Sequence, residues 1–310
     1  MNLRSLDLNL LLPLDALLQE RSVTRAAQRL GLSQPALSAS LARLRRHFDD
    51  PLLARVGNEH ELTPLAVRLR EQVRVALSGV DRVFRAEPDF DPAVSERDLR
   101  IVSSDYAETV LGAPLLALLA AEAPRMRLRF SVNTPSVVED AERVLVDADL
   151  LLLPHGFLAD LPHADLHRDR WVCLVATENP DVGEELSVDQ LRTMPWVVTY
   201  HGPVASTPAA LQMRMLGVEP HVQVVTEHFL AVPALVAGSA RIGLLQQRLA
   251  DRLPPDSGVR VLPPPVDVGL LLEAMWWHPV YTGDPEHTWL RDVVRRAAAS
   301  LPDVGGHPPR

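Results

Sequence analysis

The sequence has a single cysteine, no lysine and no apolar run long enough to cross a bilayer. One cysteine, Cys173, excludes an intramolecular disulfide and a metal site built from several thiolates. The longest apolar runs, such as Leu10–Leu12 and Leu150–Leu153, fall far short of the about 20 residues that a membrane helix needs. Asp7 and Asp15 interrupt the N-terminal region where a signal peptide would be apolar. These absences predict a cytoplasmic protein with no membrane partner.

No motif of a common enzyme class occurs. The sequence contains no G-x-G-x-x-G, Walker or G-x-S-x-G segment and no H-E-x-x-H pair. A loose group of histidines, His155, His163 and His167, lacks the spacing that would place its members on one helix face. Asp147 and Asp149 flank the start of an apolar segment, where we interpret them as a turn and not as a catalytic pair. We therefore expect no catalytic residue, no bound metal and no cofactor.

Charge is unevenly distributed along the 310 residues. The net charge of −9 alone argues against a nucleic-acid partner. Residues 1–75 nevertheless contain eleven arginines and eight acidic residues, a local balance of +3, so the remainder carries −12. All 31 basic residues are arginine, whose guanidinium group pairs with phosphate or guanine through two hydrogen bonds. A basic N-terminal part on an acidic body is the asymmetry expected when that part binds nucleic acid.

The first 90 residues are predicted to be helical, with one short β segment. Apolar residues recur at helical spacing, Gly31 ends one helix, and Ser22, Thr24 and Ser33 are candidate N-caps. A Pro- and Asp-rich stretch at residues 87–92 has the composition of a linker. The expected elements are helices at Leu6–Glu20, Arg25–Leu30 and Ser33–Phe48, β-type pieces within Pro51–Thr63, and a long helix at Thr63–Ala86.

After the linker, strands and helices alternate. This alternation predicts an α/β module with a parallel or mixed sheet covered by helices, and the Pro- and Gly-rich residues 302–310 are expected to be a disordered tail. The expected strands are Leu99–Ser103, Leu128–Val132, Leu150–Leu153, Trp171–Ala176, Val197–Tyr200, Val222–Val225, Ile242–Leu245 and Leu270–Trp276. The expected helices are Ala107–Ala123, Val137–Val146, Pro208–Leu216, Leu230–Ala237 and Glu286–Leu301.

Residues 23–44 have the pattern of a helix-turn-helix. The small Ala27 allows two helices to cross closely, Gly31 makes the turn and Leu37 buries the second helix. If Leu37, Leu41 and Leu44 face inward, the N-terminal residues of that helix face outward, where they can meet base edges in a major groove. A plain helical hairpin remains the alternative on this pattern alone. The candidate DNA-binding residues are Arg25, Ser33, Gln34, Pro35, Ser38, Arg43, Arg45 and Arg55.

The same region resembles a known family. The segments S-x-T-x-A-A-x-x-L (22–30), S-Q-P-A-L-S (33–38), P-L-L-x-R (51–55) and L-T-P (62–64) make residues 6–65 similar to the LysR-type transcriptional regulators. The closing segment 277–290, with Trp277, His278 and Trp289, resembles the branch that includes the nodulation-gene activators. The resemblance implies a winged helix-turn-helix over residues 1–62, with a wing at Leu53–Leu62 and Arg55 as its arginine. Leu53, Ala39 and the acidic wing tip depart from the family pattern.

The long helix carries a heptad pattern. Its apolar residues step by four and three over three repeats, which is the spacing of a coiled-coil seam. The alternative is a helix that packs on the core of its own domain. The resemblance implies that this helix, residues 63–87, pairs two subunits, and that effector modules join dimers into a tetramer. The candidate seam residues are Leu62, Ala66, Leu69, Val73, Ala76, Val80 and Val83.

By resemblance, residues 88–301 form an effector-binding domain like the periplasmic binding proteins. Its subdomain I comprises about 97–166 and 268–301, and its subdomain II about 167–267. Ligands in such folds lie at strand ends in the cleft, where hydroxyl, imidazole and aromatic groups suit a small molecule with a polar or anionic end and an apolar body. The candidate effector-binding residues are Ser103, Ser104, Asn133, Thr134, Tyr200, His201, Thr226, His228 and Phe229.

We therefore predict a winged helix-turn-helix joined to a two-subdomain α/β module, acting as an effector-responsive, DNA-binding transcriptional regulator and not as an enzyme. The expected partners are double-stranded promoter DNA, a small-molecule effector, a second copy of the chain in a homodimer or homotetramer, and RNA polymerase as a further candidate. Two alternatives remain: an α/β enzyme whose head only dimerises, and a constitutive DNA-binding protein with a vestigial pocket.

Overall fold

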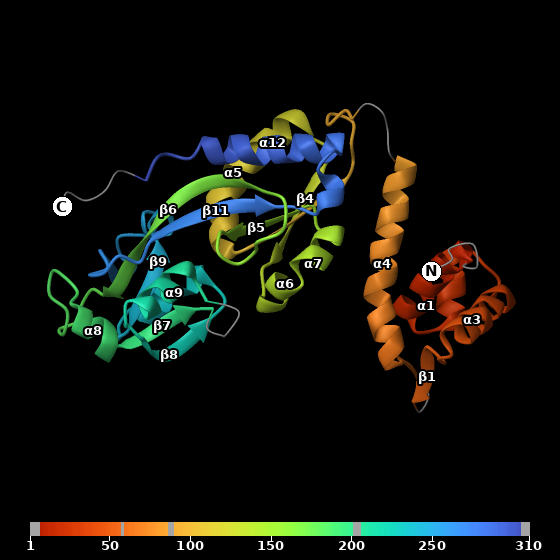
Figure 1. Ribbon diagram of the computed structural model, residues 1–310, viewed down its shortest axis with the longest axis horizontal. Coiled ribbons are helices and arrows are strands. Elements are labelled where there is room, and N and C mark those ends of the chain that lie inside the picture. Colours follow the sequence, from red (N-terminus) through yellow and green to blue (C-terminus); the bar gives the residue numbers. More distant parts are fainter. Residues whose placement is uncertain (1–6, 57–58, 86–89, 201–205, 305–310) are drawn as a thin grey trace. The chain divides into compact units, whose positions relative to one another are not determined.

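The computed structural model describes residues 7–56, 59–85, 90–200 and 206–304. The chain divides into two compact units, residues 1–88 and 89–310. Each has its own apolar core. None of the described helices is both long and apolar enough to span a bilayer. The two units are drawn in Figure 1 in red to orange and in yellow to blue, respectively.

The first unit is a small helical domain with a two-stranded wing. Ser22 caps the second helix and Gly31 ends it with a left-handed φ of 66°, so the expected turn is confirmed. Asp7 caps a 3-10 turn before the first helix, which therefore begins later than Leu6. The elements are η2 (Leu8–Leu10), α1 (Leu11–Glu20), α2 (Val23–Leu30), α3 (Gln34–Phe48), β1 (Leu53–Val56), β2 (Glu59–Leu62) and α4 (Pro64–Arg85).

The second unit contains one nine-stranded mixed sheet in the order β4-β3-β5-β11-β6-β9-β7-β8, with β10 paired to β6. Its strands are β3 (Asp98–Ser103), β4 (Arg127–Val132), β5 (Leu150–Pro154), β6 (His163–Ala176), β7 (Pro195–Thr199), β8 (His221–Thr226), β9 (Ile242–Gln246), β10 (Val259–Leu262) and β11 (Leu270–Trp276). The helices and 3-10 turns are α5 (Asp105–Glu122), α6 (Pro135–Glu139), α7 (Ala141–Asp147), α8 (Val188–Thr193), α9 (Pro208–Met215), η3 (Phe229–Ala231), α10 (Val232–Val236), α11 (Gln247–Ala250), η4 (Pro279–Tyr281) and α12 (Pro285–Ala299).

The sheet is covered on both faces, as the near-continuous apolar strands require. Leu150 and Leu152 of β5 face the core formed with α5 and α12, and Leu151 and Leu153 face the smaller core formed with α7. Figure 1 shows α5 and α12 on one side of these strands and α6 and α7 on the other. The expected α/β module is therefore confirmed.

β6 links the two halves of this unit. It runs for 14 residues, pairs with β11 through its first half and with β9 through its second, and so crosses between the expected subdomains I and II, whose boundary was placed near residue 166. The other expected boundary, near residue 267, lies between β10 and β11.

Several expected bounds were wrong. The helix expected over Val137–Val146 is two helices, because the chain leaves helical geometry at Asp140 with ψ of 30°. The helix expected over Leu230–Ala237 begins with the 3-10 turn η3. β6 begins at His163 instead of Trp171, since its first half carries polar residues that hid the strand. α8, α11 and β10 were not expected.

Candidate nucleic-acid interface and ligand pocket

α3 presents a polar end to solvent. The Ser33 Oγ accepts a hydrogen bond from the Ala36 backbone N–H at 3.4 Å, which caps the helix. Leu37 is fully buried, and Leu41 and Leu44 lie with it in the core of the first unit. The helical period then leaves Gln34, Pro35 and Ser38 exposed at the N-terminal end. The expected inward and outward faces of this helix are both present.

The candidate arginines differ in what they contact. Arg25 Nη2 donates to the Glu20 carbonyl at 2.5 Å, and its side chain is largely exposed. Arg43 forms an ion pair with Asp7, also at the surface, and such exposed pairs are weak enough to yield to a phosphate. Arg45 Nε donates to the Pro51 carbonyl at 2.9 Å. Arg45 therefore fixes the chain between α3 and the wing. Arg55 lies on β1 opposite His60, and its side chain lies outside the described residues.

One carboxylate fixes the base of the wing. Asp50 Oδ1 accepts hydrogen bonds from the Leu52 N–H at 2.6 Å and from the Thr63 hydroxyl at 2.7 Å. Thr63 in turn accepts from the Ala66 N–H at the start of α4. The turn before β1, where Leu52 has a φ of 59°, is thereby tied to the first turn of α4. The wing thus has a defined position relative to α3 within this unit.

The expected seam of α4 is divided between two environments. Ala66, Leu69 and Val73 are buried in the core of the first unit, packed with α1, and Leu62 is half-buried there. Ala76 and Val80 continue the same stripe and are exposed, and the Val83 side chain lies outside the described residues. For the first half of the helix the structure therefore favours the alternative, packing on the core of its own domain, because α1 of the same chain covers it; the subunit seam stays a prediction.

A pocket lies where strands β3, β4, β5, β7 and β9 end in the second unit. Its cavity volume is about 50 Å³, which is smaller than the roughly 300–1,000 Å³ of a typical small-molecule site. Five of the expected residues line it: Ser104, Asn133, Thr134, Tyr200 and Phe229. The other lining residues are Tyr106, Pro135, Val138, Leu152, Leu153, Pro154, Phe157, Trp171, Ser206, Thr207, Pro208, Gln246, Leu271 and Glu273.

Three of the other expected residues do not line this pocket. Ser103 is buried at the end of β3, next to the lining residue Ser104. Thr226 Oγ1 accepts from the His228 N–H at 3.1 Å, and the His228 side chain is exposed. Strand ends alone do not determine where the following loop turns, and a contact of these residues with an effector stays a prediction. His201 lies outside the described residues.

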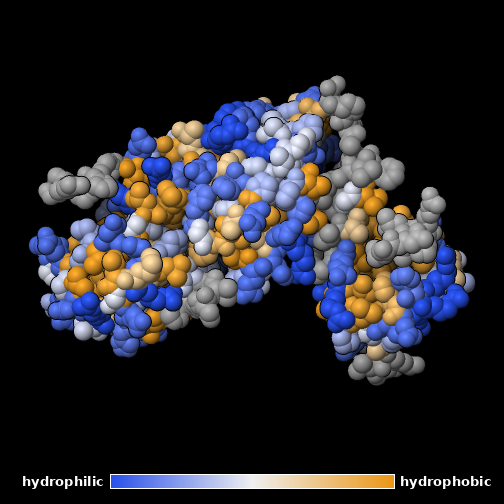
Figure 2. Space-filling model, viewed as in Figure 1, coloured by the Kyte–Doolittle hydropathy of each residue, from blue (hydrophilic) through white to orange (hydrophobic). Residues whose placement is uncertain are grey.

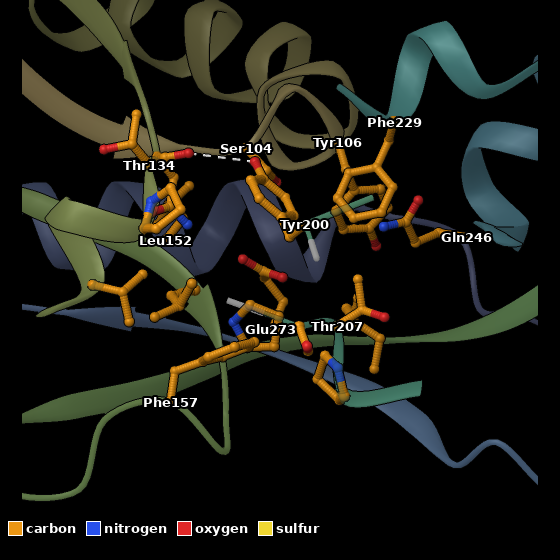
Figure 3. Close-up of a pocket in the computed structure, with 18 of the residues that line it drawn as sticks. Ser104, Tyr106, Thr134, Leu152, Phe157, Tyr200, Thr207, Phe229, Gln246 and Glu273 are labelled. Atoms are coloured by element: carbon orange, nitrogen blue, oxygen red, sulfur yellow. Dashed lines mark hydrogen bonds between the residues drawn. The ribbon is translucent and has the colours of Figure 1, made fainter. Parts of the chain in front are cut away.

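Tyr200 occupies a strained position at the pocket. Its φ of 57° is left-handed, which costs a non-glycine residue about 1–2 kcal/mol. Its N–H donates to the Thr226 carbonyl at 3.0 Å, which holds this geometry. The Tyr200 hydroxyl donates to the Asn133 carbonyl at 3.3 Å, so the side chain reaches from β7 across to the end of β4. Figure 3 shows its ring beside the pocket.

Asp105 makes a second connection across the pocket. Its carboxylate, at the start of α5, accepts hydrogen bonds from the N–H groups of Phe229 at 3.1 Å and Leu230 at 2.9 Å. The Phe229 ring packs against Tyr106, Trp171 and Tyr200. Two contacts therefore join the two subdomains at the pocket. One is charged and involves the Asp105 carboxylate, and the other is neutral and involves the Tyr200 hydroxyl.

Two buried polar residues in the pocket were not predicted from the sequence. Glu273 on β11 is 1% exposed and Gln246 at the end of β9 is fully buried. Neither carboxylate oxygen of Glu273 and neither amide atom of Gln246 has a hydrogen-bond partner among the described residues. Burial, with a smaller contribution from the charge of Asp169, raises the pKa of Glu273 to about 8. The sequence signal was one acidic residue within the apolar run of β11.

A polar cluster lies behind the pocket. The Tyr106 hydroxyl donates to Asp169 at 2.8 Å and lies 2.9 Å from His167 Nε2. Burial lowers the pKa of His167 to about 4, so its neutral ring donates to the tyrosine oxygen. The Arg248 N–H donates to Asp169 at 3.3 Å, and the Arg248 guanidinium lies 4.0 Å from the same carboxylate. Tyr106 thus connects the pocket to the crossover strand β6.

The loose histidine group is rearranged by the fold. His155 Nε2 lies 2.7 Å from Asp165, and the His155 and His163 rings pack on each other and on Trp276. Ligand atoms of these two histidines and of Asp165 fall within 4.8 Å of one another. His167 points elsewhere, toward Tyr106. The expectation that no metal binds stays a prediction.

Two family models match the chain. The model described as a bacterial regulatory helix-turn-helix protein of the lysR family matches residues 8–67, and the LysR substrate binding domain matches residues 92–299. Together they include α3 with the wing and the pocket.

Known proteins match over nearly the whole length. Nodulation protein D 2 of Rhizobium tropici is 34% identical over 305 residues, covering 97% of this chain and 96% of the relative. Nodulation protein D 1 of Mesorhizobium japonicum is 32% identical, with 98% and 97% covered. A probable transcriptional regulator from Pseudomonas aeruginosa has a TM-score of 0.66 at 26% identity, with 95% and 98% covered. CbnR in complex with its target DNA has a TM-score of 0.66 at 17% identity, with 94% and 100% covered.

Proposed function

The chain belongs to the LysR family of bacterial transcriptional regulators, and from that premise we propose that α3 reads a specific promoter sequence while the pocket binds an effector. The chain is a transcriptional regulator with an effector-binding domain, not an enzyme. Which residues recognise DNA, how subunits assemble and what the effector is are the content of the proposal. A regulator of promoters acts where the bacterial chromosome lies, in the cytoplasm.

The exposed N-terminal end of α3 supports DNA reading. Gln34, Pro35 and Ser38 lie together on the solvent side, while Leu37 anchors the helix from below. A glutamine amide can pair with adenine, a serine hydroxyl with several base edges, and a proline ring with a thymine methyl group. Arg25 and Arg43 at the surface suit phosphate, which positions the protein without specifying sequence. CbnR, which has the same fold, has been solved on its target DNA.

Gel-shift titration tests this role of Gln34. The operator is first selected from random sequence with the full chain. Gln34→Ala should then weaken binding to the operator by about 1–3 kcal/mol and binding to random DNA hardly at all. The control is Gln72→Ala, which removes another exposed glutamine, on α4, and should leave both affinities unchanged. An equal loss on both DNAs for Gln34→Ala would refute base reading by this residue.

The exposed part of α4 supports a dimer. Ala76 and Val80 extend the apolar stripe of α4 whose first half is buried. Both are exposed, Val80 to 41%. Figure 2 shows apolar surface over the region of α1 and α4. A second copy of the same helix is the partner that its heptad spacing fits. Two copies would place two α3 helices on half-sites related by symmetry. A homotetramer through the second unit, and a contact with RNA polymerase, extend this proposal.

The pocket favours an effector-responsive regulator over a constitutive DNA-binding protein. A vestigial pocket would be expected to fill with apolar side chains, because unsatisfied polar groups are costly to bury. This pocket instead keeps Glu273 and Gln246 buried with their polar atoms unpartnered among the described residues. Groups in that state are typical of a site that pairs them with a ligand.

A further inference from the structure

We propose that His155, His163 and Asp165 bind a divalent transition-metal ion of the Zn²⁺ class. These residues lie at the start of the loop between β5 and β6 and at the beginning of β6. They are separate from the residues that line the pocket, so the proposal goes beyond the roles given above. It replaces the expectation that no metal binds, which rested on the spacing of the histidines in the sequence.

The fold brings the three ligand groups together. The His155 backbone N–H donates to the Leu272 carbonyl at 3.0 Å, which fixes this residue just after β5. His163 and Asp165 are two residues apart on β6, so their side chains emerge on the same face of the strand. One ligand atom from each residue lies within 4.8 Å of those from the other two. Atoms that share a tetrahedral Zn²⁺ ion lie about 3.4 Å apart, so small rotations of the side chains complete the site.

The hydrogen bonds of the two imidazole rings suit metal binding. His155 Nε2 lies 2.7 Å from Asp165 Oδ1, so these two ligand groups already point toward one another. His163 Nδ1 lies 3.2 Å from the Leu161 carbonyl. Because a carbonyl only accepts, Nδ1 is the donor, and the neutral ring has its lone pair on Nε2. Metal-bound histidines are typically held by their other ring nitrogen in this way.

The side chains around the cluster combine support with access. The Trp276 ring, 1% exposed, packs against both imidazoles, with ring centroids 4.5 Å from His163 and 5.5 Å from His155. It therefore limits the movement of the two rings. The Asp165 side chain is 80% exposed, so an ion can reach the cluster from solvent. A bound ion would lie close to the Trp276 indole, which then reports on its presence.

The ligand set determines the class of ion. Two imidazoles and one carboxylate suit Zn²⁺ and neighbouring transition metals, whereas Mg²⁺ and Ca²⁺ prefer oxygen ligands throughout. Three protein ligands leave the fourth tetrahedral position to a water molecule. The ion would join the two ends of the loop between β5 and β6, which carries the pocket residue Phe157. Metal binding would thus hold one wall of the pocket in place.

Calorimetric titration with Zn²⁺ tests the proposal on the full chain, prepared without a polyhistidine tag. We expect one strong site per chain, from which excess Mg²⁺ does not displace Zn²⁺. His163→Ala and Asp165→Asn should each weaken Zn²⁺ binding at least about tenfold, because loss of a mere second-shell partner already costs about 10–100-fold. Both side chains are exposed, so the variants should unfold in urea as the unmodified protein does.

Tryptophan fluorescence gives an independent readout with Ni²⁺, a paramagnetic ion that quenches a nearby indole. Ni²⁺ should quench part of the emission of the unmodified protein, through Trp276, and much less of that of His163→Ala. The control is His221→Ala, which removes another exposed histidine, on β8, and should preserve both Zn²⁺ affinity and quenching. The proposal is overturned if the unmodified chain binds no Zn²⁺, if His163→Ala and Asp165→Asn keep its affinity, or if His221→Ala loses as much as they do.

Discussion

Replacing Glu273 by glutamine should change how the stability of the effector-binding domain depends on pH. The pKa of Glu273 is raised from 4.5 to about 8 by burial. Between these values the folded protein keeps a proton that the unfolded chain has released. Stability therefore falls with rising pH by about 1.4 kcal/mol per unit until the pH passes the folded-state pKa. Glutamine does not titrate, so the Glu273→Gln variant loses this slope.

The expected magnitude is a substantial fraction of the stability of a domain. From pH 5.5 to pH 8 the free energy of unfolding of Glu273→Gln should rise by about 3 kcal/mol relative to that of the unmodified protein. His167, whose pKa burial lowers to about 4, titrates in the opposite sense below pH 6.5, but it does so in both proteins. The difference between the two proteins isolates Glu273.

Urea unfolding followed by tryptophan fluorescence measures this difference. All five tryptophans lie between residues 171 and 289, so the signal reports on the effector-binding domain and not on the DNA-binding domain. Glu139→Gln should follow the unmodified protein at every pH, because Glu139 is exposed. Parallel curves for Glu273→Gln and the unmodified protein would refute the claim that Glu273 is protonated when folded.

Three further changes test the remaining sites. Val80→Asp should convert the assembly to smaller species in sedimentation with loss of operator binding, because it places a charge in the exposed half of the α4 stripe. The control Val67→Asp, on another face of α4, should leave the assembly unchanged. An unchanged assembly for Val80→Asp would show that α4 does not pair. Arg45→Ala should lower the stability of the DNA-binding domain by about 1 kcal/mol through the lost bond to Pro51 and weaken operator and random DNA alike; a loss confined to the operator in gel shifts would instead make Arg45 a base-reading residue. Ser104→Met should block binding of a small neutral aromatic probe, 2-naphthol, in calorimetry by filling the pocket. Ser104→Thr keeps the hydroxyl that caps α5 and should bind the probe; equal binding by both variants would place the ligand elsewhere.

The sequence predicted local geometry well where one residue type has a local physical role. Ser33 caps α3 and Gly31 ends α2 as their chemistry requires. The α4 stripe shows the limit of this reasoning. Its heptad period was visible, but the period is the same whether α1 or a second chain covers the stripe. The change from buried residues up to Val73 to exposed residues from Ala76 could therefore not be predicted from the spacing.

The pocket shows a similar limit. Strand ends could be located, and Ser104, Asn133 and Tyr200 followed from them. Glu273 could not, because its burial depends on β11 lying between β5 and β6, which are distant from it in sequence. Thr226 ends β8 and His228 follows it, but neither lines the pocket, and the Thr226 hydroxyl accepts a hydrogen bond from the His228 N–H.

The contacts of Asp105 and Tyr200 across the pocket have a consequence for the speed of binding. They join the two subdomains through hydrogen bonds to Phe229, Leu230 and Asn133. The cavity of about 50 Å³ is too small for a typical effector, so we expect these bonds to open before a molecule fits beside Glu273, which makes opening a separate step before association. At high ligand concentration the observed association rate should then level off at the opening rate instead of rising without limit. Asp105→Ala would raise that plateau, so the protein's response time is set by its own bonds as much as by the supply of effector.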